Sequence, residues 1–113
     1  MIQFYHNSRC GKSRDGLAIL QESGKDFTTI NYLETPPSES ELEDIIKKLD
    51  IRPIDLVRKN ESIWKEQFKD RELDDKAIID AMVKHPILIE RPIVINGTRA
   101  TIGRPPLKIL AII

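Results

Sequence analysis

Short apolar runs and a helical pattern alternate along the first third of the chain. Ile2–Tyr5 is a mostly apolar run typical of a buried strand, and Phe27–Tyr32 predicts a second strand. Between them, from Lys12 onward, the apolar positions recur at helical intervals. Gly24 then stands where a C-terminal helix cap belongs. A strand, a helix and a strand within about thirty residues predict a βαβ unit.

The middle of the chain carries only helical patterns. Ser38 and Glu41 have the spacing of a capping box, and apolar residues follow at helical intervals at positions 42, 45, 46 and 49. A further helix is predicted over Asp75–Lys84, with Ile78, Ile79, Met82 and Val83 on one face. We expect short helical pieces in the intervening residues 51–73.

The period changes again near the C-terminus. Ile93–Ile95 and Thr98–Ile102 are β-prone, and the Asn-Gly pair between them is a strong hairpin signal because both central residues take positive φ. Pro105 and Pro106 then open a last helix. The elements predict an α/β fold with a mixed four-stranded sheet: a βαβ unit, a helical insert, a hairpin and a helix. A thioredoxin-like fold has this order; another small α/β sandwich is the alternative.

Length, charge and cysteine count narrow the class of protein. A chain of 113 residues fits one domain, residues 1–113, with a core that needs no metal or disulfide. The 18 basic and 18 acidic residues balance, which does not favour nucleic acid or a membrane as a partner. The N-terminus is too polar for a signal peptide and no run is long enough to span a membrane, so we expect a cytoplasmic protein. The single cysteine cannot form an internal disulfide.

Cys10 is the candidate nucleophile. It lies after a predicted strand and at the start of a predicted helix, where unpaired N–H groups and a partial positive charge favour a thiolate. A helix terminus typically contributes only about 0.3–1 kcal/mol to the stabilisation of a nearby anion. Nearby cations must therefore add to the stabilisation of a thiolate at Cys10. Four candidates lie within four residues of the cysteine: His6, Arg9, Lys12 and Arg14. The alternative is a small, buried, inert cysteine; we expect a reactive thiol partly reachable by solvent.

Two neighbours of Cys10 are candidates for supporting roles. Ser13 completes the spacing of a redox C-x-x-C motif with the second thiol replaced by a hydroxyl. This hydroxyl could donate a hydrogen bond to the thiolate or cap the helix. His6 could hold the loop or influence the thiolate, or it could be a solvated loop histidine. Without a second cysteine, an oxidised Cys10 must be rescued by another molecule.

Three arginines stand at predicted element boundaries: Arg58, Arg91 and Arg104. A guanidinium offers paired donors in a fixed plane, which suits a tetrahedral oxyanion. Taken alone, each of them is more often a surface arginine.

Four stretches of the chain resemble one family. HNSRCGKSR is similar to the active-site loop of the glutaredoxin-coupled arsenate reductases, in which H-N-P-x-C-x-x-S-R is usual and proline stands at the position of Ser8. LVRKNE, HPILIERPIVI and IGRPP resemble later motifs of that family in the same order. The similarity extends from Tyr5 to Pro106.

This resemblance implies a fold, a site and a reaction. The fold is thioredoxin-like, with Pro92 at the position of its cis-proline. Cys10 would attack arsenate held by Arg58, Arg91 and Arg104, with His6 and Ser13 in the site. Glutathione would be a co-substrate and glutaredoxin a partner in reducing arsenate to arsenite for arsenic detoxification. No bound cofactor or metal is expected, and we expect a monomer.

Two other functions remain open from the sequence. A regulatory branch of the same superfamily binds RNA polymerase and carries a C-x-x-C redox switch, which Ser13 would abolish here. The chain could also be a thiol reductase acting on another oxyanion or on a glutathione mixed disulfide.

Overall fold

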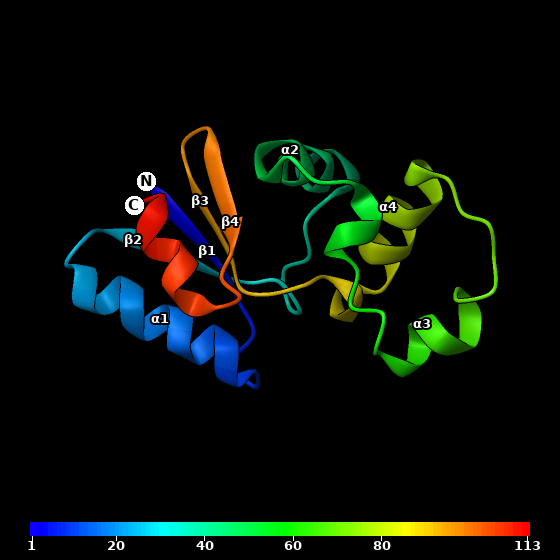
Figure 1. Ribbon diagram of the computed structural model, residues 1–113, viewed down its shortest axis with the longest axis horizontal. Coiled ribbons are helices and arrows are strands. Elements are labelled where there is room, and N and C mark those ends of the chain that lie inside the picture. The colour runs from blue at the N-terminus through cyan, green and yellow to red at the C-terminus, as the bar shows by residue number, and fades with distance from the viewer. The chain divides into compact units, whose positions relative to one another are not determined.

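The structure, a computed structural model, describes residues 1–113 and divides into two compact units (Figure 1). The first unit joins residues 1–35 to residues 91–113, and the second consists of residues 36–90. The first unit holds all four strands, whereas the second is helical. The helical insert predicted from the sequence is therefore confirmed. The expectation of a single domain over 1–113 stays a prediction, which cooperative unfolding would test.

A mixed four-stranded sheet forms the centre of the first unit, as predicted. Its strands are β1 (Ile2–His6), β2 (Phe27–Asn31), β3 (Ile93–Asn96) and β4 (Arg99–Ile102), in the order β2-β1-β3-β4. The β1–β2 pair is parallel, and both β1–β3 and β3–β4 are antiparallel. The central position of β1 places its C-terminal end, and hence the Cys10 loop, beside β3.

Two helices of the first unit share one hydrophobic core with the sheet. Helix α1 (Gly11–Ser23) contributes Leu20, and the 3₁₀ helix η3 (Pro106–Ala111) contributes Ile109. Both side chains pack with Phe4 and Val94, which are directly opposite each other in the register of β1 and β3. Gly24 caps α1 with a φ of 72°, as predicted. The predicted last helix has the tighter 3₁₀ geometry over Pro106–Ala111, a longer run than is usual for this type.

The hairpin forms one residue later than the sequence predicts. Asn96 is the last residue of β3 and pairs with Arg99, so the two loop residues are Gly97 and Thr98. Only Gly97 has a positive φ, 64°. The prediction that both Asn96 and Gly97 take positive φ is therefore wrong. A glycine at the first of two loop positions can turn the chain alone, which leaves Asn96 in the ladder.

The second unit consists of short helices around its own apolar side chains. Helix α2 (Glu39–Leu49) begins at the predicted capping box, with Glu41 N–H donating to Ser38 Oγ at 3.2 Å. Helix α4 covers Asp75–Lys84 as predicted. The expected pieces between them are η1 (Pro53–Leu56) and α3 (Ser62–Gln67), and η2 (Pro86–Leu88) follows α4. An isolated antiparallel bridge joins Val57, which follows η1, to Ile89, which follows η2.

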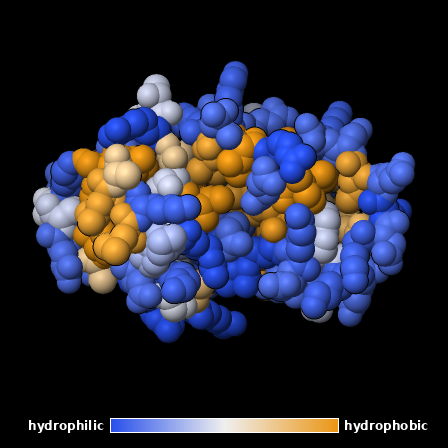
Figure 2. Space-filling model, viewed as in Figure 1, coloured by the Kyte–Doolittle hydropathy of each residue, from blue (hydrophilic) through white to orange (hydrophobic).

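The surface of the first unit includes one apolar area at the C-terminal helix. Leu107 and Leu110 of η3 are exposed, and Figure 2 shows orange side chains over this helix among mostly hydrophilic ones. Nowhere does the fold contain a helix with the length and apolar character needed to cross a membrane.

Candidate active site

Cys10 is the N-cap residue of α1, as the sequence predicts. Its backbone is extended, with φ −101° and ψ 124°, and its carbonyl accepts the Arg14 N–H at 3.0 Å to begin the helix. The sulfur therefore lies at the end of the helix that carries unpaired N–H groups. Only 8% of the residue's surface is exposed. The position is confirmed, but the thiol is more enclosed than we expected for a nucleophile.

Asn7 organises the loop that carries the cysteine. Its carbonyl accepts the Cys10 N–H at 3.0 Å, and its side-chain Oδ1 accepts the Arg9 N–H at 3.0 Å. The Ser8 carbonyl accepts a hydrogen bond from Arg14 Nη1 at 3.1 Å. These bonds fix the turn on both sides of Ser8. The loop is therefore held by side chains of its own sequence, although Ser8 stands where the resembled motif has proline.

Ser13 connects the end of β1 to α1. It is fully buried; its Oγ lies 2.8 Å from His6 Nδ1 and accepts the Asn7 N–H at 3.0 Å. Both of these partners lie before α1 and neither is an N–H of the helix, so the capping role considered for Ser13 is wrong. The hydroxyl instead contacts the end of β1, where the buried His6 Nδ1 and Asn7 N–H both need a hydrogen-bond partner. Donation to the thiolate stays untested.

His6 is a buried loop-holding residue. Its exposure is 8%, so the alternative of a solvated loop histidine is wrong. Burial lowers the pKa of His6 from its ordinary value near 6.5, and the positive charge of Arg14 lowers this pKa further. The neutral imidazole is therefore favoured, and one of its two ring nitrogens can accept the Ser13 hydroxyl proton.

The side chain of Arg104 reaches the backbone of Arg91. Arg104 Nη1 donates to the Arg91 carbonyl at 3.3 Å. Arg91 is buried, including its Nε and Nη1 atoms, whereas Arg104 is exposed. Each precedes a cis-proline, Pro92 and Pro105, so the expected cis-proline at Pro92 is confirmed and a second one is added.

Small residues let α1 and the chain after β4 approach Pro92 closely. A Cβ on Gly16 would lie 3.2 Å from Pro92 Cγ, and one on Gly103 would lie 3.0 Å from the same atom. The Gly103 N–H also donates to the Pro92 carbonyl at 2.8 Å. Pro92 therefore packs between α1 and Gly103, the residue that precedes Arg104.

Arg58 lies in the second unit and is held by two carboxylates. Its Nη1 forms an ion pair with Glu61, and its Nε lies 3.9 Å from Oε1 of Glu90. Its backbone N–H donates to the Leu88 carbonyl at 2.7 Å. The side chain is 21% exposed. The convergence of all three guanidiniums on Cys10 stays a prediction.

The chain matches the model of one protein family over most of its length. Residues 5–112 match the model described as the ArsC family. The chain belongs to the ArsC family. The uncharacterised protein YfgD of Escherichia coli K12 is 42% identical over 99% of this chain and 96% of its own length. An arsenate reductase of Neisseria meningitidis is 40% identical over 99% and 97%, respectively.

Solved structures agree with this assignment to the ArsC family. The arsenate reductase from Vibrio cholerae superposes with a TM-score of 0.94 at 41% identity, over 99% of this chain and 97% of that one. The thioredoxin-like ArsC fold predicted from the sequence is therefore confirmed.

Within this ArsC fold, sequence reasoning missed the role of Asn7. An Asn-Ser pair between a strand and a helix is a turn signal, and Asn side chains often bond to backbone two residues on. The structure shows that bond to Arg9. Arg14 was considered only as a cation near the thiol, yet it also fixes the Ser8 carbonyl. Among the described residues, no group of three or more His, Cys, Asp or Glu side chains is arranged to hold a metal ion.

Proposed function

We propose that this protein reduces arsenate to arsenite, with Cys10 as the nucleophile. The observation that carries the proposal is the position of its only cysteine at the N-cap of α1, on a loop fixed by Asn7 and Ser13. The fixed loop holds the sulfur at the N-terminus of the helix in position for attack. The ArsC family match and arsenate reductase relatives near 40% identity support arsenate as the substrate.

The electron balance requires thiols from outside the chain. Reduction of As(V) to As(III) takes two electrons, which two thiols supply when they become a disulfide. The chain has one cysteine. Cys10 can therefore hold the arsenic, while the two thiols that become a disulfide come from other molecules. Glutathione as co-substrate and glutaredoxin as partner satisfy this requirement.

In the proposed reaction, arsenic is bound, reduced and released in four steps. The Cys10 thiolate forms an S–As bond and a protonated arsenate oxygen leaves as water, with arsenic still As(V). Glutathione then forms a second S–As bond, and another arsenate oxygen leaves as water. A glutaredoxin thiolate then attacks the glutathione sulfur, and the electron pair of the broken S–As bond stays on arsenic, which becomes As(III). Hydrolysis of the Cys10–As bond releases arsenite and restores the thiol.

The arginines have distinct tasks in this proposal. Arg91 and Arg104, joined through the Arg91 carbonyl, would bind the oxyanion and neutralise charge as the S–As bond forms. Arg58 would add a third guanidinium after it exchanges a carboxylate for the oxyanion. We also propose that the protein acts as a cytoplasmic monomer.

The decisive experiment is a purified assay with arsenate, glutathione and glutaredoxin, in which arsenite is quantified. We expect arsenite only when all three are present, and none from Cys10→Ser. Circular dichroism of both proteins serves as the folding control. If the folded, reduced wild-type protein forms no arsenite, the reaction is wrong; if Cys10→Ser retains activity, the nucleophile is wrong.

A further inference from the structure

A pocket within the second unit combines an aromatic wall with several cations. We call it the Trp64 pocket; its volume is about 700 Å³. That volume is within the range of small-molecule sites, roughly 300–1,000 Å³. All of its lining residues belong to residues 36–90, and none of them is used in the proposed reaction.

The apolar part of the Trp64 pocket is built around stacked rings. Trp64 is 6% exposed, and its ring stacks on that of Phe68 with centroids 5.5 Å apart and an interplanar angle of 26°. Phe68 in turn meets His85 edge-on at 5.9 Å. Ile54 and Leu73 also line the pocket. Fixed rings and aliphatic side chains suit a flat, apolar body.

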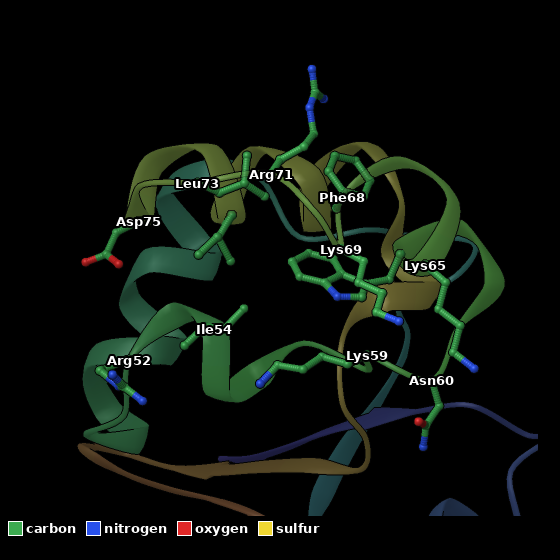
Figure 3. A pocket seen from close by; sticks show the side chains of 12 residues that line it. Arg52, Ile54, Lys59, Asn60, Lys65, Phe68, Lys69, Arg71, Leu73 and Asp75 are labelled. Carbon is green, nitrogen blue, oxygen red and sulfur yellow. The ribbon is translucent and has the colours of Figure 1, made fainter.

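The polar part of the pocket is strongly biased toward positive charge. Five lining residues are basic, namely Arg52, Lys59, Lys65, Lys69 and Arg71, and only Asp75 is acidic. Figure 3 shows Lys59 reaching toward Ile54, whereas Arg71 and Asp75 are both directed away from the hollow. The protein as a whole is neutral, so this local excess is not a reflection of overall charge.

We propose that the Trp64 pocket binds a small organic anion with a flat apolar ring. The ring would lie against the aromatic and aliphatic wall, and its carboxylate, sulfonate or phosphate would face the lysines. An acidic segment of a partner protein would share the charge but would extend beyond a pocket of this size. The dimensions therefore favour a small molecule.

The test uses Trp64 itself, because it is the only tryptophan in the chain. The probes are 8-anilinonaphthalene-1-sulfonate and its uncharged relative N-phenyl-1-naphthylamine. We expect saturable quenching of Trp64 fluorescence by the sulfonate, weakened by salt. The uncharged relative should bind at least about tenfold more weakly, because it lacks the group that the cations bind.

Matched double variants identify the site. Lys59→Gln/Lys69→Gln should raise the dissociation constant of the sulfonate about tenfold. Lys25→Gln/Lys108→Gln, which removes the same charge from exposed sites of the first unit, should leave it unchanged. Equal binding by the two double variants, equal binding of both probes, or no saturation with the sulfonate would each overturn the proposal.

A competition experiment separates the two kinds of occupant. Displacement of the sulfonate by 1-naphthoate supports the small-molecule site. Displacement by a peptide of alternating glutamate and phenylalanine but not by 1-naphthoate would overturn it and assign the pocket to a partner protein. These measurements contain no arsenate or reductant, so their outcome is independent of whether the proposed reaction holds.

Discussion

Nδ1 of His6 lies 2.8 Å from Oγ of Ser13, and this contact joins the end of β1 to the first turn of α1. The same Oγ accepts the Asn7 N–H at 3.0 Å. One hydroxyl therefore satisfies two polar groups at the start of the Cys10 loop, in a place where Ser13 is fully buried. The position that suggests a lost redox thiol is a structural anchor of that loop.

Removal of this hydroxyl is expected to destabilise the fold. Ser13→Ala leaves the Asn7 N–H and a ring nitrogen of His6 buried without their partner, which should lower the free energy of unfolding by about 1–3 kcal/mol. Urea denaturation measures this. Ser8→Ala, at an exposed position of the same loop, is the control and should change it by no more than about 0.5 kcal/mol. Equal effects from the two variants would contradict the anchoring role.

The lowered pKa of His6 predicts a pH-dependent stability. Because this pKa is lower in the folded state than its ordinary value near 6.5, the unfolded state takes up the proton first as pH falls. Stability should be full above pH 6.5, decrease as pH drops below it, and level off once pH is below the folded-state pKa. Urea denaturation between pH 8 and 5 should show this decrease in the free energy of unfolding. In His6→Gln the part of the decrease that comes from protonation of His6 should be absent.

Arg14 provides a sharper test of the cause. Its charge contributes to the lowered pKa of His6, so Arg14→Gln should raise this pKa toward its ordinary value. The chain has two histidines, and NMR titration of the imidazole protons, with His85→Gln for assignment, follows His6 directly. An unchanged titration in Arg14→Gln would leave burial as the only cause.

The elements were predictable where local chemistry defines them. The Ser38 capping box, the Gly24 cap and the helix over Asp75–Lys84 all depend on residues close in sequence, and all are confirmed. The hairpin was displaced by one residue because Asn-Gly marks a turn without specifying which pairing closes it. Arg91 and Arg104 flank the hairpin, which brings them near each other, but the bond from Arg104 to the Arg91 carbonyl depends on the turn after β4 and could not be derived. They were selected by their positions at element boundaries and by their match to family motifs.

Burial was the least predictable property of the candidate site. His6 and Ser13 appear in a polar stretch, yet both are buried because the end of β1 lies at the centre of the sheet. Cys10 is more enclosed for a related reason, since its N–H bond to Asn7 folds the loop back toward β1. A local pattern of polar residues does not report the neighbours that cover it.

Replacement of Gly16 by alanine should destabilise the protein, although Gly16 lies in a helix. Alanine normally stabilises a helix interior by about 0.8–1.0 kcal/mol relative to glycine. Here the added Cβ would lie 3.0 Å from Ile109 Cδ1 and 3.2 Å from Phe4 Cε1, which is overpacking that typically costs about 1–3 kcal/mol. Gly16→Ala should therefore lower thermal stability. Gly11→Ala, which meets only the flexible Arg14 side chain at 3.8 Å, should not. A stabilised Gly16→Ala would show that this contact relaxes freely.

The ion pair between Arg58 and Glu61 predicts an effect on arsenate affinity. If Arg58 binds the oxyanion, Glu61 competes for the same guanidinium, so Glu61→Gln should lower the KM for arsenate. Partly exposed pairs of this kind contribute up to about 1 kcal/mol, which corresponds to a roughly fivefold change. Glu66→Gln, at an exposed position of α3, is the control. A higher KM in Glu61→Gln would mean that the carboxylate positions Arg58 rather than competing for it.

Arg91→Lys separates the geometry of the arginines from their charge. Lysine keeps the positive charge but offers a single ammonium in place of the planar pair of donors. If Arg91 binds the developing oxyanion, kcat/KM for arsenate should fall at least about tenfold, or about 1.4 kcal/mol in transition-state stabilisation. Since Arg91 is buried, urea denaturation must accompany the kinetics to separate misfolding from lost binding.

The control for Arg91→Lys is Arg99→Lys in the same hairpin. Arg99 is exposed and its Nη2 donates to the Ile112 carbonyl at 2.9 Å, away from the cis-proline turns. Its kcat/KM should remain within about twofold of wild type. A folded Arg91→Lys protein with unchanged kcat/KM would show that only positive charge is needed at this position. A loss shared equally by the two variants would show that the hairpin as a whole, rather than the Arg91 guanidinium, is responsible. Only a loss confined to Arg91→Lys supports paired hydrogen bonds from Arg91 to the oxyanion.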